Sequence, residues 1–294
     1  MKILLTGSTG QVGYELVRSL QGLGQVVALD RSAMDLADLD QVRSVIRQIQ
    51  PQLIVNPAAY TAVDRAESEP ALAFRVNAEA PGVIAQEAKV LGAALVHYST
   101  DYVFDGAQPG ARVEGDVTGP LNVYGASKLA GEQAIAASGV DHLIFRTSWV
   151  YGMHGKNFLL TMLRLARERE ELRVVDDQHG APTWSRTIAD TTALVLAQAR
   201  AFVPAQGGEA RDWWRQNGGV YHLSAQGQTT WCEFTRAIVA AAGLSCRVAP
   251  ISSAEYPTTA RRPHYSVLSS ERLIERFCRL PDWQQALQLC LGSA

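Results

Sequence analysis

The residues best suited to chemistry are Tyr124 and Lys128, which stand four positions apart, and Thr100, which lies 24 residues before Tyr124. Residues four apart on a helix share one face, so a helix opening at Tyr124 would hold the phenol beside the ammonium. A free phenol has a pKa of about 10, and a nearby cation favours the phenolate and lowers that value. We therefore predict a proton donor at Tyr124, with the Thr100 hydroxyl holding a carbonyl oxygen against it while a hydride reaches the carbon.

A glycine-rich turn near the N-terminus indicates where the hydride donor binds. Residues 2–6 predict a short buried strand that runs directly into Gly7, Gly10 and Gly13, and apolar positions at helical spacing follow. Glycines at such a turn let the backbone approach a pyrophosphate, and the helix N-terminus offers free N–H groups and a favourable dipole. The pattern predicts a dinucleotide site.

Asp30 and Arg31 leave the identity of the dinucleotide open. Asp30 follows a second apolar run, residues 26–29, and stands 17 residues after Gly13, close to the offset at which a carboxylate meets the adenine ribose. That carboxylate favours the unphosphorylated ribose of NADH, whereas Arg31 could accept the 2′-phosphate of NADPH. We therefore expect NADPH or NADH.

The elements that position these residues alternate between strand and helix, as a parallel sheet requires. After the first two strands we expect a helix capped by Asp38, a strand at 53–55, a helix at 69–91, a strand ending at Tyr98, a helix at 124–138 and a strand at 142–145. Thr100 then lies at the carboxyl end of a strand, where open α/β sheets bind their ligands. The fold class predicted is α/β, with a doubly wound parallel (Rossmann) sheet through about residue 147.

Beyond that point the pattern becomes irregular, which predicts a smaller C-terminal domain that supplies substrate contacts. We expect a dinucleotide-binding domain at 1–147, rejoined by a helix and a strand within about 187–225, and a mainly substrate-binding domain at 148–294. Residues 202–219, which hold two glycine pairs and two tryptophans, resemble a surface insertion.

Length and composition exclude several classes of protein. The 294 residues, 47% hydrophobic, suffice for a large core. A net charge of −2 gives no electrostatic footprint for nucleic acid or an anionic membrane, and no apolar run approaches the length of a membrane span. Four scattered cysteines have neither metal-ligand spacing nor disulfide density, and no signal peptide precedes the first strand, so we expect a cytoplasmic protein with reduced thiols.

Seven segments spread over nearly the whole chain carry a family resemblance: residues 7–13, 61–67, 99–104, 120–128, 146–151, 180–183 and 262–263. Through them the chain resembles the extended short-chain dehydrogenase/reductase superfamily and, within it, the family of dTDP-4-dehydrorhamnose reductases. The last three segments separate this family from the epimerases and dehydratases that share the cofactor fold and the Tyr-x3-Lys pair.

The resemblance implies roles for individual residues. Thr100, Tyr124 and Lys128 match the catalytic set, with Tyr124 protonating the oxygen while hydride reaches C4′ of dTDP-4-dehydro-β-L-rhamnose. Thr100, Asp101 and Trp149 match contacts to the dTDP-sugar. Positions that match cofactor contacts are Gly10, Gln11, Val12, Asp30, Asp35, Leu36, Ala58, Ala59, Tyr60 and Tyr98. To these the residue patterns add Gly7, Gly13 and Arg31, and Tyr124 and Lys128 also face the cofactor.

Arg262 lies in a loop near the C-terminus, where its guanidinium suits a pyrophosphate or sugar partner. A solvated loop is the alternative interpretation. We include Arg262 among the expected substrate contacts.

The resemblance also raises the question of a metal ion. Members of the family commonly carry Mg²⁺ bound by carboxylates at a subunit contact, and Glu15 stands at one such position, but Arg186 stands where an acidic partner is expected. A lone surface carboxylate binds Mg²⁺ poorly, so we predict no metal in catalysis, and we leave Mg²⁺ binding and a homodimer open.

Two other functions stay open at this point. The chain could be a reductase or epimerase of another nucleotide sugar. It could also be a non-catalytic regulatory subunit that keeps the nucleotide fold, although such proteins tend to lose a catalytic residue and Thr100, Tyr124 and Lys128 are all present.

Overall fold

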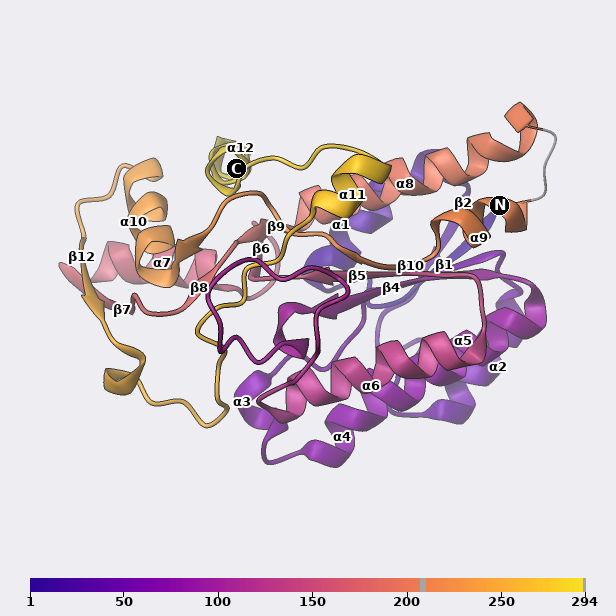
Figure 1. Ribbon diagram of the computed structural model, residues 1–294, viewed down its shortest axis with the longest axis horizontal. Helices are drawn as coiled ribbons and strands as arrows, with labels where there is room; N and C mark the ends of the chain where they lie inside the picture. The colour runs from indigo at the N-terminus through magenta and orange to yellow at the C-terminus, as the bar shows by residue number, and fades with distance from the viewer. Residues whose placement is uncertain (207–209, 293–294) are drawn as a thin grey trace.

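Six parallel strands form the central sheet of the computed structural model, which describes residues 1–206 and 210–292 (Figure 1). The strands lie in the order β2-β1-β3-β4-β5-β10, and their bounds are β1 Lys2–Leu5, β2 Gln25–Ala28, β3 Leu53–Asn56, β4 Ala94–Thr100, β5 His142–Thr147 and β10 Gly219–His222. Because the order of strands reverses at β1, between β2 and β3, the sheet is doubly wound. The predicted fold class is confirmed.

Helices cover both faces of this sheet (Figure 1). One face packs on α2 Leu39–Ile49, α5 Ala80–Leu91 and α6 Val123–Ser138, and the other on α1 Gln11–Ser19, α8 Ser185–Gln206 and α9 Ala210–Asn217. Successive residues of β1 alternate between the two cores, with Ile3 and Leu5 in one and Leu4 in the other. The strands are therefore buried on both sides, as their continuous apolar sequence predicts.

The helix expected at 69–91 is divided by a π-helical turn. It begins as α4 Pro70–Phe74, passes through the turn η2 Arg75–Glu79 and continues as α5. A short helix, α3 Val63–Ala66, precedes it. The expected cap of α2 is confirmed, because the Asp38 side chain accepts a hydrogen bond from the backbone N–H of Gln41.

A smaller group of elements lies beside the sheet, at the left of Figure 1. It has its own apolar core, to which α7, α10 and α12 contribute. The bounds of the group are β6 Val150–Tyr151, α7 Phe158–Glu168, β7 Glu171–Val175, β8 His179–Gly180, β9 Thr183–Trp184, β11 Thr229–Thr230, α10 Trp231–Ala241, β12 Arg247–Ile251 and α12 Trp283–Gly292. The remaining short elements are η1 Gln21–Leu23, η3 Asp101–Val103, η4 Ser253–Glu255 and α11 Glu271–Arg276.

The chain returns to the large sheet through α8 and β10. Helix α8 packs against α1, and the Ser19 hydroxyl donates a 2.6 Å hydrogen bond to Asp190. Strand β10 extends the sheet by pairing in parallel with β5. Residues of both the first and the last third of the chain thus build the large sheet, while the predicted domain boundaries stay a prediction.

The prediction of a surface insertion at 202–219 is wrong for residues 210–217. Residues 207–209 of this stretch lie outside the described residues. Residues 210–217 form α9, whose Trp213 is only 4% exposed and packs in the same core as Tyr221 and Phe277. Residues 210–217 are therefore an eight-residue helix that packs on the same face of the sheet as α1 and α8. Within the described ranges, no helix is both long and apolar enough to cross a membrane.

Candidate active site

The glycine turn between β1 and α1 lies at the carboxyl edge of the sheet and tolerates no side chain at two positions. Gly7 has a φ of +57°, and a Cβ there would lie 2.9 Å from the Cβ of Ala58. A Cβ on Gly13 would lie 2.0 Å from the carbonyl oxygen of Gly7. Gly10 caps α1 without a side-chain hydrogen bond. The first turn of α1 therefore presents backbone N–H groups at a surface that only glycines leave open, which suits a pyrophosphate.

Asp30 and Arg31 follow β2 at the same edge. Asp30 accepts hydrogen bonds from the Ser32 backbone at 2.9 Å and the Ser32 hydroxyl at 2.6 Å, and these, with one from Ala33, lower its pKa. Arg31 is exposed and pairs with Asp35 at 3.2 Å. Both residues predicted to meet the ribose thus lie just after the end of β2, with the Arg31 guanidinium reaching solvent.

Two other residues predicted to contact the cofactor have side chains that are buried in the core. Leu36 and Tyr98 have buried side chains, 5% and 6% exposed, and the Tyr98 hydroxyl bonds to Thr192 at 2.8 Å in the core. The site-facing atom of Tyr98 is instead its backbone carbonyl, which accepts a hydrogen bond from Lys128. A contact from Tyr98 to a cofactor would therefore involve its backbone.

The loop after β3 is held by Asn77, which the site prediction did not include. Asn77 accepts a hydrogen bond from the Tyr60 N–H at 2.8 Å and donates to the Tyr60 carbonyl at 2.9 Å and to Ser127 at 3.0 Å. Asn77 lies in the π-helical turn η2, which periodicity alone does not reveal. Its amide fixes the loop of Ala58 and Tyr60 against α6.

The structure brings Thr100 to Tyr124, and Lys128 lies one turn further along the same helix. Helix α6 begins at Val123, one residue before Tyr124, because the Asn122 side chain caps it by accepting a hydrogen bond from Gly125. Thr100 ends β4 and is hydrogen-bonded to Tyr124. The Thr100 hydroxyl also donates to Asp101 at 2.9 Å.

Burial raises the pKa of Tyr124 to about 12; the Thr100 hydrogen bond opposes this shift and the Asp101 charge adds to it. The expectation that Lys128 lowers this pKa is wrong for this structure, because desolvation of the phenolate is the larger effect. Tyr124 is therefore protonated at neutral pH, which is the state that a proton donor requires.

Lys128 is 2% exposed, an unusual burial for an ammonium. Its Nζ donates to the Tyr98 carbonyl at 2.6 Å and lies 3.1 Å from Nε2 of His97. Burial lowers the pKa of Lys128 to about 8, opposed by the charge of Glu132. Glu132 itself forms a buried ion pair with Arg146 at 2.7 Å.

Aromatic side chains border the site on the side of the smaller group of elements. Trp149, at a φ of +46°, stacks on Trp231 with ring centroids 3.6 Å apart and planes at 7°. Tyr102 meets Tyr124 edge to face at 5.9 Å. Trp231 and Tyr102 were missed by the site prediction. One face of the Trp149 indole is therefore covered by protein.

Asp101 and Arg262 lie near this border. Burial raises the pKa of Asp101 to about 6, against hydrogen bonds from Ser266 and Thr100. Arg262 bonds to both carboxylate oxygens of Asp64, at 3.0 and 2.7 Å. Arg262 is thus held in a fixed place and is not a solvated loop residue.

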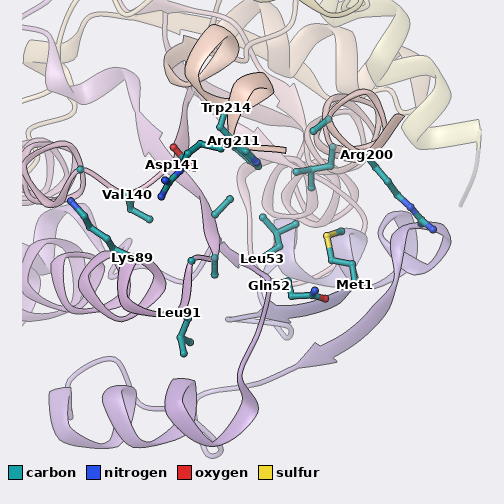
Figure 2. A pocket seen from close by; sticks show the side chains of 16 residues that line it. Met1, Gln52, Leu53, Lys89, Leu91, Val140, Asp141, Arg200, Arg211 and Trp214 are labelled. Atoms are coloured by element: carbon teal, nitrogen blue, oxygen red, sulfur yellow. Dashed lines mark ion pairs between the residues drawn. The ribbon is translucent and has the colours of Figure 1, made fainter. Parts of the chain in front are cut away.

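A cavity of about 700 Å³ lies at the opposite end of the sheet (Figure 2). Its walls include Gln52 and Leu53 at the start of β3 and the basic residues Lys89, Arg200 and Arg211. None of the predicted site residues contributes to it in the part of the chain that the structure describes. We place the candidate site at the carboxyl edge, where Thr100 and Tyr124 meet. Within the described residues, no group of three or more His, Cys, Asp or Glu side chains could hold a metal ion.

The chain is similar to known proteins over its whole length. A family model described as RmlD substrate binding domain matches residues 1–294. The dTDP-4-dehydrorhamnose reductase of Burkholderia thailandensis is 52% identical over 300 residues, covering 99% of this chain and 98% of the relative. The enzyme of the same name from Escherichia coli K12 is 44% identical over 304 residues, covering 100% and 98%.

Two solved structures are also similar to this chain over its whole length. A dTDP-4-dehydrorhamnose reductase from Clostridium acetobutylicum superposes with a TM-score of 0.91 at 33% identity, covering 100% of this chain and 99% of the other. The Bacillus anthracis reductase, solved in complex with NADP, has a TM-score of 0.89 at 34% identity, with the same coverage.

Proposed function

The chain belongs to the dTDP-4-dehydrorhamnose reductase family, and we propose that it reduces the C4′ keto group of dTDP-4-dehydro-β-L-rhamnose with NADPH or NADH. The observation that supports this proposal is the contact of Thr100 with Tyr124 on the edge of the sheet that also holds the glycine turn, with Lys128 buried one turn further along α6. A hydroxyl, a protonated phenol and a buried ammonium at that edge are the groups that a carbonyl reduction needs.

Tyr124 is the general acid in the proposed mechanism. Bound nicotinamide supplies the hydride. Tyr124, protonated at neutral pH because burial raises its pKa to about 12, donates its phenolic proton to the substrate oxygen. Thr100 turns its hydroxyl proton from Asp101 to the same oxygen and orients it. A positioned acid of this kind typically contributes 10²–10⁴-fold in rate.

Lys128 has two tasks. Its ammonium would hold the nicotinamide ribose by donating to the ribose hydroxyls, and its charge would stabilise the Tyr124 phenolate that remains after proton transfer. The four-residue spacing on α6 supports both, because it sets the two side chains on one face of the helix.

The dinucleotide would be held by the glycine turn and the ends of β2, β3 and β4. A cradle that a Cβ on Gly7 or Gly13 would fill fits a closely bound pyrophosphate. We propose as its contacts Gly7, Gly10, Gln11, Val12, Gly13, Asp30, Arg31, Asp35, Leu36, Ala58, Ala59, Tyr60, Tyr98, Tyr124 and Lys128.

The dTDP-sugar would lie between this edge and the smaller group of elements, in contact with Thr100, Asp101, Trp149 and Arg262. A guanidinium has five N–H donors, so Arg262 can keep its pair with Asp64 and still donate to a diphosphate oxygen. The uncovered surface of Trp149 can pack against the deoxysugar ring. We accordingly propose residues 1–147 as the cofactor domain and 148–294 as mainly the substrate domain.

The test is to incubate the protein with NADPH or NADH and a panel of 4-keto sugar nucleotides, following cofactor absorbance and identifying the product. We expect dTDP-4-dehydro-β-L-rhamnose to be reduced with the highest kcat/KM. A higher kcat/KM with NADH would mean that Asp30 sets the cofactor preference, and a higher kcat/KM with NADPH would mean that Arg31 does. A higher kcat/KM with another sugar nucleotide would show that this other compound, and not dTDP-4-dehydro-β-L-rhamnose, is the substrate. If none of the sugar nucleotides is turned over, the result would favour a non-catalytic regulatory subunit.

We also propose a cellular compartment for the protein. The described structure has four free cysteines and no disulfide among them, which supports a reducing compartment such as the cytoplasm. A homodimer stays a prediction, and light scattering of the purified protein tests it.

A further inference from the structure

A line of buried hydrogen bonds joins the glycine turn to Lys128. The Thr6 hydroxyl accepts a hydrogen bond from the Ala58 N–H at 3.3 Å and donates to Oδ1 of Asn56 at 2.6 Å. Nδ2 of Asn56 lies 3.1 Å from Nδ1 of His97, and Nε2 of His97 lies 3.1 Å from Nζ of Lys128. The three inner residues, Asn56, His97 and Lys128, are 1%, 0% and 2% exposed.

Among the described residues, His97 is one of two hydrogen-bond partners of the Lys128 nitrogen. The other is the Tyr98 carbonyl, at 2.6 Å. Glu132, on α6, contributes charge but gives its oxygens to Arg146 on β5, at 2.7 to 3.2 Å. Among the described residues, no carboxylate is hydrogen-bonded to Lys128. A buried ammonium without a paired carboxylate is costly, so its hydrogen-bond partners decide where it lies and how readily it ionises.

The direction of the hydrogen bonds follows from the orientation of the Asn56 amide, whose Oδ1 faces Thr6 and whose Nδ2 faces His97. The Thr6 hydroxyl accepts from the Ala58 N–H and gives its own proton to Asn56 Oδ1. Asn56 then presents its NH₂ to His97 Nδ1, which leaves the ring proton on Nε2, facing Lys128. This arrangement fits a neutral amine, whose lone pair accepts that proton.

A protonated Lys128 needs the opposite arrangement. If the Asn56 amide turns over, its oxygen accepts from Nδ1–H of His97, and the bare Nε2 accepts from the ammonium. Asn56 then donates to the Thr6 hydroxyl, which can accept twice. His97 itself stays neutral, because burial and the Lys128 charge hold its pKa well below the usual value.

We infer that His97 is a positioning residue that holds Nζ of Lys128 against the Tyr98 carbonyl in both charge states, and that Asn56 and His97 reverse their hydrogen bonds when Lys128 ionises. When Lys128 loses one proton to solvent, the single ring proton of His97 moves from Nδ1 to Nε2, and the Asn56 amide turns over. The inference deepens the proposed reduction and rests on it for the role of Lys128.

The ionisable groups around the pair are few. Tyr124 and Glu132 lie one turn before and one turn after Lys128 on α6, Arg146 and His142 lie on β5, and Asp101 follows β4. Tyr124 is protonated and Glu132 is paired with Arg146 near neutral pH, and the pKa of Asp101, about 6, lies below the pKa of Lys128, about 8.

The first experiment is a nuclear magnetic resonance titration without substrate. The chain has four lysines, so protein labelled with ¹³C-lysine gives four ε-carbon signals, and Lys128→Met identifies the one of interest. We expect that signal to titrate at about 8. In His97→Phe it should titrate lower by about one pH unit, because the ammonium loses a charge-assisted hydrogen bond that is stronger than the one lost by the amine.

Two variants sharpen this result. His97→Gln places an amide, able to donate or accept, near the position of Nε2, and should restore the wild-type titration. His222→Phe makes the same change at another fully buried histidine, on β10, and should leave the Lys128 signal unmoved. A Lys128 titration that is the same in His97→Phe as in the wild type would overturn the inference.

A second measurement uses the wild-type chain alone and so does not depend on whether a variant folds. Ring ¹⁵N shifts of His97 should report the Nδ1–H tautomer below the Lys128 titration and the Nε2–H tautomer above it. One tautomer throughout would refute the reversal. Neither experiment needs turnover, so a failure of the proposed reduction, seen as no consumption of cofactor, is separate from a failure of this inference.

Discussion

Arg262 and Asp64 are joined by two hydrogen bonds, Nη1 to Oδ1 at 3.0 Å and Nη2 to Oδ2 at 2.7 Å, across 198 residues of sequence. Asp64 belongs to α3, beside the sheet, whereas Arg262 belongs to the loop that leads into the last part of the chain. Asp64 also accepts from the Ala260 N–H at 3.0 Å. One carboxylate thus sets both the loop and the guanidinium that we propose for the diphosphate.

Replacing Asp64 with Asn should therefore weaken substrate binding more than catalysis. The loss of charge and of one fork of the bidentate pair lets the guanidinium move, so the KM for the dTDP-sugar should rise about tenfold while kcat changes less than threefold. Glu168→Gln, at the exposed Arg164–Glu168 pair, is the control and should leave both constants unchanged. Steady-state kinetics measure the effect, and a fall in kcat at constant KM would contradict it.

Tyr124→Phe removes the proposed acid and little else. The ring and its edge contact with Tyr102 remain, so the protein should fold and bind NADPH with near-normal affinity. We expect kcat to fall about 10²–10⁴-fold. Tyr256→Phe, at a tyrosine that is 62% exposed, is the matched control. Near-normal turnover by Tyr124→Phe, with cofactor affinity checked by fluorescence titration, would remove Tyr124 from the mechanism.

The sequence predicts the parts of this site that depend on local pattern. Gly7 and Gly13 follow from the strand, turn and helix signals beside them, the Tyr124 helix follows from its own local pattern, and the structure has all of them. Thr100 follows from the same logic, at the end of an apolar strand.

The residues that were missed depend on contacts between distant segments. Trp231 reaches Trp149 from 82 positions away, and the strands next to these residues, β11 and β6, pair with β8 and β9 over only two residues each. The contact of Asn77 with the Tyr60 loop can be predicted only when the π-helical turn that carries Asn77 is known. The sign of the Tyr124 pKa shift was wrong because spacing reveals a neighbouring charge but not the burial that outweighs it.

Gly180→Ala should disturb the aromatic border of the site without touching the catalytic groups. A Cβ at Gly180 would lie 2.4 Å from Cε2 of Trp149, so the indole must shift from its stack on Trp231. The KM for the dTDP-sugar should rise about tenfold or more, with cofactor affinity unchanged. Gly115→Ala, where a Cβ would meet nothing within 4 Å, controls for the substitution itself. An unchanged KM would mean that Trp149 does not contact the sugar.

Lys128→Met should make the protein more stable while abolishing activity. Burial lowers the folded-state pKa of Lys128 from 10.5 to about 8, so below pH 8 the fold bears the full cost of a buried ammonium, about 3 kcal/mol. Between about 8 and 10.5 the unfolded chain binds the proton and the folded chain does not, so wild-type stability rises with pH across that window. Methionine fills a similar volume without charge, so urea unfolding at pH 7 should show a higher free energy of unfolding for Lys128→Met, and the difference should shrink towards pH 10. A wild-type stability that stays level relative to the variant between pH 8 and 10 would show that Lys128 is not desolvated in the fold.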